Sequence, residues 1–326
     1  MNDLAPPPAS LLDERGAPRE GAYAGLIPDS LLPCGRLRGL RQKLWRYAGV
    51  FTQEWAVGVA IADIGYLGVT FAYIARGSEL CEKAWKTPAA AGMHIGPPDG
   101  ASVAVAPGRT VTLAATRQGG LTASFVLPEI RAELDIQGEG TPLTVVSDVG
   151  RGSGRPGLTI KRAGLAAHGT LYFRGQRHVL DDAHACLDFT QAFFPRRTVW
   201  RWATAGGRLG DGRRVGFNLA LGVHDDAQGR FNENALWIDG QPAALPAVAF
   251  TPALGTAPWS IRSADGAVDL LFTPRGERSE DVNLLALSSR YRQPFGTFTG
   301  RLRDASGRVV RITDIPGVTE DHEAVW

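Results

Sequence analysis

The sequence is poor in cysteine and lysine. Its three cysteines, Cys34, Cys81 and Cys186, lie far apart and form no C-x-x-C motif, so neither a disulfide framework nor a cysteine zinc site is expected. Lysine occurs four times, and 35 basic residues stand against 33 acidic ones. A dedicated nucleic-acid binder would carry a clustered basic face, so this balance predicts no nucleic-acid partner.

Several motifs of known chemistry are also missing. There is no Walker motif, no H-E-x-x-H and no G-x-S-x-G. The segment Gly152–Gly157 matches G-x-G-x-x-G, but a strand pattern follows it where a dinucleotide site needs a helix. We therefore predict no cofactor and no metal. The N-terminus lacks a secretory signal pattern, which indicates a cytoplasmic protein.

One long apolar run, Trp55–Ala75, could be mistaken for a membrane span. Asp63 lies near its middle, and Gly65 follows two residues later. A charge at that depth costs roughly 2.5–3.5 kcal/mol in a bilayer. The run therefore predicts a buried β-hairpin and no stable membrane insertion.

The remaining pattern is that of strands and turns. Forty glycines and 21 prolines separate short alternating runs, which indicates an all-β chain. We expect an extended arm over residues 1–30, a first antiparallel barrel over 31–190 and a second over 191–326. Apolar residues at helical spacing over residues 36–47 predict one short basic helix outside the barrels, which either contacts a membrane surface or lies across a barrel end.

Two polar groups could line a cavity. His184, Cys186 and Asp188 share one strand face, which suits either a ligand site or a hydrogen-bonded trio at the domain junction. Asn218 faces Glu233 and Asn234 across a predicted hairpin. Convergent polar groups in an apolar barrel can orient a ligand or a proton transfer, but capping of the hairpin end is the alternative.

Aromatic and acidic residues mark further candidates. Trp200 and Trp202 share a face, as core or as a binding platform. His224 and the two aspartates after it are residue types that bind metals, but the same segment also suits a solvated turn. The segment Glu320–Trp326 is expected to fold back onto the body with Trp326 as its anchor, near Arg196, Arg197 or Arg201; a frayed tail is the alternative.

Several short motifs carry a family resemblance. They are Arg196–Trp202, His184–Phe189, Gly216–Asn218, Asn232–Ala235 and Glu320–His322. In this order they resemble a bacterial family called domain of unknown function 2804. The two-barrel pattern is also similar to tandem lipocalin-like proteins of the carotenoid hydratase type and to fungal cyclases, which implies calycin-like barrels. Fold alone does not define function.

The leading functional hypothesis is a cytoplasmic binding protein for a lipophilic small molecule, because a small barrel encloses room for one such ligand. The alternative is an acid–base enzyme, a hydratase, isomerase or cyclase, with Asp63, Glu233 or His322 as proton carriers. Carbohydrate hydrolysis would need an open cleft with two carboxyls. The predicted ligand-binding residues are Lys161, His184, Asp188, Trp200, Trp202, Asn218, Asn234 and Asp321.

Overall fold

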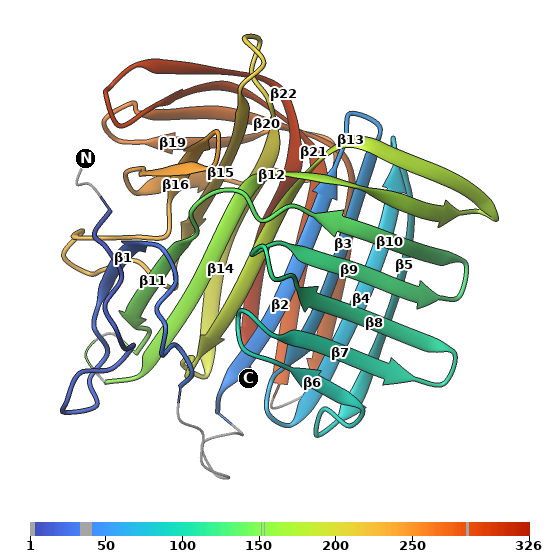
Figure 1. The fold of residues 1–326 in the computed structure, drawn as a ribbon, viewed down its shortest axis with the longest axis horizontal. Helices are drawn as coiled ribbons and strands as arrows, with labels where there is room; N and C mark the ends of the chain where they lie inside the picture. The colour runs from blue at the N-terminus through green and yellow to red at the C-terminus, as the bar shows by residue number, and fades with distance from the viewer. Residues whose placement is uncertain (1–3, 33–40, 151, 153, 285–286) are drawn as a thin grey trace.

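The computed structural model describes residues 4–32, 41–150, 152, 154–284 and 287–326, and these form two antiparallel β-sheets without a helix (Figure 1). The larger sheet has 13 strands and the smaller has nine. The larger sheet follows the order β5-β4-β3-β2-β13-β12-β10-β9-β8-β7-β6, with β11 on β12 and β1 on β11. Its strands are β1 (Gly21–Ala24), β2 (Lys43–Phe51), β3 (Trp55–Asp63), β4 (Leu67–Arg76), β5 (Glu79–Pro88), β6 (Met93–Ile95), β7 (Ala101–Ala106), β8 (Arg109–Ala115), β9 (Leu121–Leu127), β10 (Ile130–Ile136), β11 (Leu143–Asp148), β12 (Pro156–Phe173) and β13 (Gln176–Ala192).

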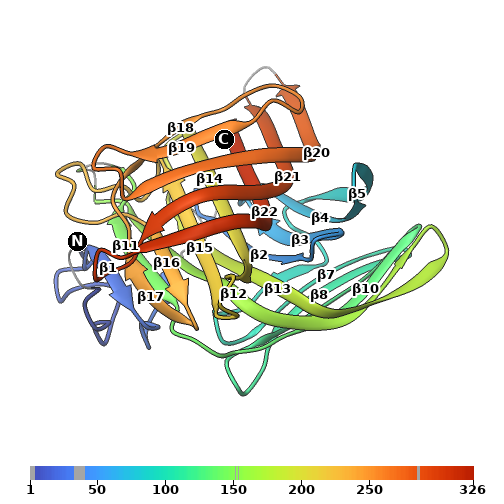
Figure 2. The same cartoon turned by 90° about the horizontal axis from the view of Figure 1, so that it is seen from above.

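The smaller sheet follows the order β17-β16-β15-β14-β22-β21-β20-β19-β18, so the last strand of the chain lies at its centre. Its strands are β14 (Arg197–Arg208), β15 (Arg214–Leu221), β16 (Ala235–Ile238), β17 (Gln241–Ala244), β18 (Val248–Thr251), β19 (Trp259–Ser263), β20 (Val268–Leu284), β21 (Leu287–Arg303) and β22 (Val309–Val325). Both sheets curl, and their hydrogen-bonded order stays open at the ends (Figure 2). They are therefore half-barrels, where the sequence predicted two calycin-like barrels in tandem.

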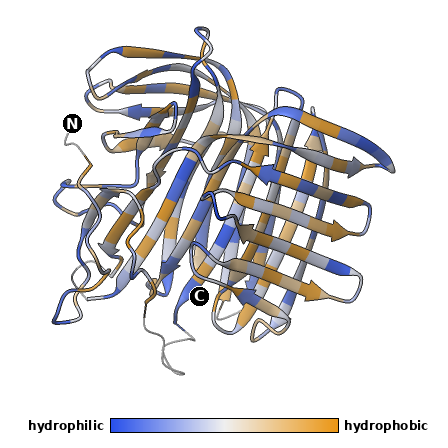
Figure 3. Cartoon of the chain, in the orientation of Figure 1, coloured by the Kyte–Doolittle hydropathy of each residue, from blue (hydrophilic) through white to orange (hydrophobic). Residues whose placement is uncertain are grey.

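Alternation of apolar and polar residues explains why these segments are strands. In β10 the residues Ile130, Ala132, Leu134 and Ile136 are buried and the residues between them are exposed. A period of two places one side of each strand against the core and the other in water. Strand β9 alternates in the same way, and hydrophobic and hydrophilic bands follow one another along strands of this sheet (Figure 3).

Glycine allows the two sheets to meet at a close backbone contact. Gly164 sits at a register shift in β12 with a φ of 74°, in the left-handed region that glycine tolerates. A Cβ on Gly164 would lie 2.7 Å from the Val215 carbonyl oxygen, and one on Gly216 would lie 2.2 Å from the Ala163 carbonyl carbon. No larger residue fits at either position, so these glycines fix how closely β12 approaches β15.

The apolar core has separate parts. One cluster fills the first half-barrel and a second fills the other. A third joins the sheets and includes Tyr47, Tyr73, Trp202, Phe295 and Val318. Aromatic side chains dominate this joint cluster, and it borders the cavity described below.

The predicted helix over residues 36–47 is wrong where it can be compared. Residues 36–40 lie outside the described part, and Lys43–Tyr47 belong to strand β2. Strand β2 pairs with β13 on one side and β3 on the other, and Arg46 is buried within it. Pairing on both edges satisfies the backbone of this segment, so tertiary context overrides its helical spacing. The membrane-surface contact predicted for residues 36–47 depended on an amphipathic helix. Over Lys43–Tyr47 that helix is absent.

The apolar run Trp55–Ala75 forms the antiparallel hairpin of β3 and β4, as predicted. Among the described residues, no helix is long and apolar enough to cross a membrane. The N-terminal segment lies along the first sheet, with Leu11 and Ile27 buried and β1 paired to β11.

Candidate functional site between the two sheets

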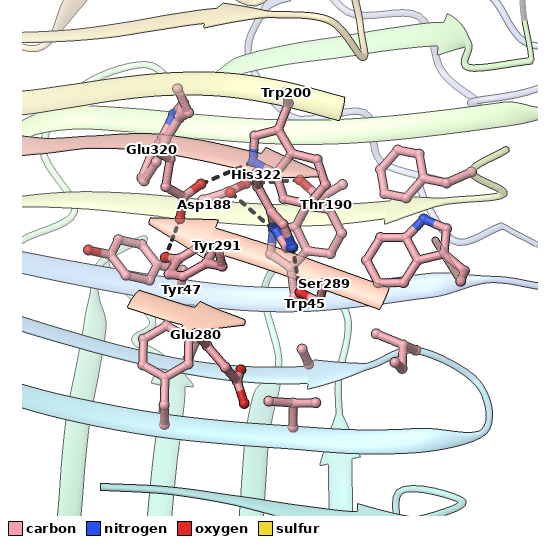
Figure 4. A pocket seen from close by; sticks show the side chains of 18 of the residues that line it. Trp45, Tyr47, Asp188, Thr190, Trp200, Glu280, Ser289, Tyr291, Glu320 and His322 are labelled. Carbon is pink, nitrogen blue, oxygen red and sulfur yellow. Dashed lines mark hydrogen bonds between the residues drawn. The ribbon is translucent and has the colours of Figure 1, made fainter. Parts of the chain in front are cut away.

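A cavity of about 250 Å³ lies where the two sheets face each other. Its walls are mostly aromatic and aliphatic, with a small set of titratable side chains among them (Figure 4). This composition is typical of a site for a small, largely apolar molecule. The titratable residues of the lining are Tyr47, Tyr66, Lys86, Lys161, Asp188, His224, Glu233, Arg278, Glu280, Tyr291, Glu320 and His322.

The first sheet contributes one row of side chains that runs across its strands. Lys161 on β12 pairs with Asp188 on β13, and Asp188 pairs with Tyr47 on β2. Neighbouring positions on one face of a sheet lie side by side, so the row continues across β3, β4 and β5. Its further members are Ala60, Phe71 and Ala84, and all six residues line the cavity.

Lys161 lies between two carboxylates, and we call Lys161, Asp188 and Glu233 the Lys161 cluster. Its Nζ is 2.9 Å from Asp188 Oδ1 and 3.4 Å from Glu233 Oε2. All three side chains are buried. Burial opposes the charge of Lys161, but the two carboxylates outweigh it and raise its pKa. The lysine is therefore a fixed cation.

The two carboxylates have different surroundings. Asp188 also accepts hydrogen bonds from Trp45 Nε1 at 3.0 Å and from the Thr190 hydroxyl at 3.0 Å. For Glu233 the only described partner of Oε2 is Lys161. Burial raises the pKa of Glu233 to about 7, with Lys161 opposing the rise and Asp188 adding to it. Glu233 can therefore exchange a proton near neutral pH.

Two asparagines hold the segment that carries Glu233. Asn218 Nδ2 donates to the Glu233 carbonyl at 2.7 Å, and Asn218 Oδ1 accepts from Trp202 Nε1 at 2.7 Å. Asn234 Oδ1 accepts from the Ala220 amide at 2.6 Å. These bonds fix Glu233 against β15, although it lies just outside a strand.

The second sheet contributes a corresponding row of side chains across its strands. Trp200 on β14 pairs with His322 on β22, which pairs with Tyr291 on β21, which pairs with Glu280 on β20. All four line the cavity. On β22 the inward positions are Glu320 and His322.

Glu320 is held by three donors, and we call Glu320, Tyr291, Gln293 and Trp200 the Glu320 cluster. Trp200 Nε1 donates to Oε2 at 3.0 Å, and Gln293 Nε2 donates to Oε1 at 3.1 Å. The Tyr291 hydroxyl also donates to Oε1. Burial raises the pKa of Glu320, against the lowering effect of the bonds from Tyr291 and Trp200.

His322 is kept neutral. Its Nε2 is 2.9 Å from the Ser289 hydroxyl, and its ring lies 4.1 Å from the Trp200 ring. Burial, aided by the Arg278 charge, lowers the pKa of His322 to about 3. The neutral ring can donate or accept one hydrogen bond at Nδ1, which has no partner among the described residues.

A stack of indoles connects the sheets. Trp45 on β2 stacks on Trp200 on β14 at 6.1 Å, and Trp200 stacks on Trp326 at 6.5 Å. Trp326 Nε1 donates to the Thr198 hydroxyl at 2.9 Å. The three indoles also line the cavity, so the stack joins the two sheets along its apolar wall.

The structure separates the residues predicted for the site into two groups. Those that line the cavity are Lys161, Asp188, Trp200, Trp202, Glu233 and His322. Those outside its lining are Asp63, His184, Asn218, Asn234 and Asp321.

The residues of the second group lie elsewhere in the fold. Asp63 accepts a bond from the Gly65 amide at 2.7 Å in the β3–β4 turn. His184 is buried on β13, where its neighbours include Gly206 on β14. Asp321 lies on the other face of β22 from His322 and pairs with Arg201 at 3.2 Å. The segment Glu320–Val325 lies in the central strand β22, where a folded-back tail was expected.

Sequence reasoning missed Arg278 and Tyr291, and it misplaced His224. His224 was expected in a solvated turn, but it is buried, and its Nδ1 is 2.8 Å from the Ser147 hydroxyl. Burial, with a contribution from Lys161, lowers the pKa of His224 to about 3. Among the described residues, no group of three or more His, Cys, Asp or Glu is placed to hold a metal ion.

The fold and the site define a class: a two-sheet β-protein with an apolar cavity that contains buried acids and bases. The chain belongs to the family described as domain of unknown function DUF2804, whose model matches residues 4–326. No curated protein sequence matches it.

Solved structures share the fold. A candidate AttH protein from Nitrosomonas europaea is 14% identical, with a TM-score of 0.50 over 92% of this chain and 98% of that one. CghA is 13% identical, with a TM-score of 0.53 over 100% of this chain and 94% of that one. Kievitone hydratase from Nectria haematococca is 10% identical, with a TM-score of 0.49 over 100% and 98%. The first two likenesses extend over nearly the whole of both chains.

Proposed function

We propose that the protein is an acid–base catalyst that transfers a proton to or from carbon in a lipophilic small molecule bound between the two sheets. One observation carries the proposal: Glu233, buried beside Lys161, has a pKa of about 7 and lines an otherwise largely apolar cavity. A general acid or base works best when its pKa lies near the operating pH. A protein that only stores a lipophile gains nothing from a buried group that titrates there.

The Lys161 cluster supports such proton transfer. Glu233 in its acid form can give a proton to a double bond, and Lys161 then stabilises the carboxylate left behind. The reverse transfer restores the acid. This set of residues fits three reactions: addition of water, double-bond isomerisation and cyclisation.

The experiment uses deuterium from heavy water. The purified protein is incubated in heavy water with lipophilic metabolites extracted from its own cells, and mass spectrometry follows deuterium bound to carbon. We expect one metabolite to become labelled by wild-type protein and by the Asp321→Asn control, which changes a carboxyl on β22 outside the cavity lining. Glu233→Gln should lower the labelling rate by about 10²–10⁴-fold.

A second candidate is a carrier of lipophilic molecules, which the aromatic stack of Trp45, Trp200 and Trp326 favours. The same experiment separates the two. If a metabolite co-purifies with the protein but gains no deuterium, the acid–base proposal is wrong and the carrier is supported.

A further inference from the structure

Arg278 on β20 is an incompletely bonded cation in the wall of the cavity. Its Nε and Nη2 donate to Glu82 Oε1 at 2.9 and 2.5 Å. Its Nη1 is buried and has no hydrogen-bond partner among the residues that the structure describes. An unmet buried donor is costly, most of all on a charged group, so Nη1 is suited to an oxygen that arrives with a ligand.

The guanidinium is also fixed in orientation. It lies 3.8 Å from the Phe71 ring centre on one sheet and 4.7 Å from the Tyr291 ring centre on the other. Glu82 on β5 holds its other edge. Donors that are already oriented need no rearrangement when charge develops on a bound oxygen.

The charges around Arg278 favour a neutral ligand oxygen over a negatively charged one. Glu82 already compensates the guanidinium, and Glu320 is close enough for the Arg278 charge to act on its pKa. A ligand carboxylate would add a further negative charge to this end of the cavity. A neutral carbonyl oxygen accepts the Nη1 hydrogen bond without that repulsion.

We propose that Arg278 Nη1 binds the carbonyl oxygen of the substrate, which makes the substrate class a lipophile with a ketone or aldehyde. This assignment deepens the proposed function and rests on it for the reaction. Arg278 and Glu233 line the same cavity, but the register places Phe71, which Arg278 covers, four strands from Lys161, which Glu233 contacts, so the carbonyl binds at one end of the cavity and the proton is exchanged at the other.

Three matched probes test the oxygen site without requiring turnover. They are 2-acetylnaphthalene, 2-ethylnaphthalene, which lacks the oxygen, and 2-naphthoate, which carries a negative charge. Dissociation constants come from quenching of tryptophan fluorescence. We expect the ketone to bind wild-type protein about tenfold or more tightly than the ethyl compound, and more tightly than the carboxylate.

The variant Arg278→Met/Glu82→Gln removes the cation together with its partner, so no buried carboxylate is left alone. It should bind 2-ethylnaphthalene as wild type does and lose the preference for the ketone. The control Arg292→Met/Glu277→Gln removes a similar pair, 2.6 Å apart, outside the cavity lining and should keep it. Equal binding of ketone and ethyl probe by wild type, or a preference that survives in Arg278→Met/Glu82→Gln, overturns the proposal.

A measurement on wild-type protein covers the case in which the variant does not fold. The carbon-13 resonance of a labelled carbonyl in 2-acetylnaphthalene should move downfield on binding, because a charged donor polarises the bond; an unchanged resonance overturns the site. Failure of the deuterium experiment with this preference intact would leave the oxygen site standing and remove the acid–base chemistry.

Discussion

The Lys161 cluster and the Glu320 cluster treat buried charge in opposite ways. Around Lys161 on β12, the lysine pairs with the buried carboxyls of Asp188 and Glu233 and compensates their charge. Around Glu320 on β22, the hydrogen-bond donors are uncharged and the neighbouring His322 is neutral, while the nearby Arg278 takes its counter-charge from Glu82 on β5. The comparison shows that the Lys161 cluster combines a fixed cation with an acid that can exchange a proton, and that the Glu320 cluster presents uncharged hydrogen-bonding groups.

The largest expected effect comes from removing the central cation of the first sheet. Lys161→Met leaves two buried carboxylates uncompensated, and breaking such a pair costs about 3–5 kcal/mol. Urea unfolding of the variant measures the loss. The double variant Lys161→Met/Asp188→Asn should recover part of it, and a loss below about 1 kcal/mol in the single variant would contradict the assigned role of the lysine.

The pH dependence of stability should reveal Glu233. Its folded pKa of about 7 lies above the ordinary value of 4.5, so between these values the folded protein holds a proton that the unfolded chain has lost. Raising the pH through this window therefore lowers stability, by up to about 3 kcal/mol. Urea unfolding at several pH values should show that loss relative to Glu233→Gln. Parallel curves for the two proteins would mean that the pKa is not raised.

His322 should act at lower pH and with the opposite sign. Its folded pKa of about 3 lies below the ordinary 6.5, so the unfolded chain takes up a proton first as the pH falls. Between pH 6.5 and about 5, wild type should lose about 2 kcal/mol relative to His322→Gln. His224 titrates in the same window and is present in both proteins, so the difference isolates His322. No difference between the curves would indicate that His322 is not kept neutral by burial.

The smallest effect is expected at Asp63, outside both rows. Asp63→Asn weakens one local bond to the Gly65 amide and should cost about 0.5–1.5 kcal/mol. Thermal unfolding measures this cost, and binding of 2-acetylnaphthalene should stay unchanged. Weaker binding in this variant would return Asp63 to the site.

Local pattern predicted part of this arrangement. Period-two alternation predicted an all-β chain, the hairpin over Trp55–Ala75 and the shared face of Trp200 and Trp202. It could not show that β22 lies between β14 and β21, because that pairing joins residues about 120 positions apart, as Arg201 and Asp321 illustrate. The position of Glu320 beside Trp200 and Trp202 follows from that pairing and not from its sequence neighbours.

Charge pattern also misled at two places. The basic residues between Leu37 and Tyr47 suggested a solvated helix face, but Arg46 is buried and donates to the carbonyls of Pro97 and Gly100. The acidic neighbours of His224 suggested a wet turn, yet its ring packs against Phe194. In both cases partners distant in sequence provide the burial.

The central position of β22 has a consequence for synthesis. This strand leaves the ribosome after every strand with which it pairs, so the edges of β14 and β21 stay unpaired until it arrives. Unpaired edges invite pairing with other chains, and long-range pairing slows folding. Glu320 and His322 arrive with the same strand. Until β22 is made, a nascent chain therefore exposes the strand edges that are most prone to association, and its cavity is incomplete. Binding of a chaperone would matter most during this interval.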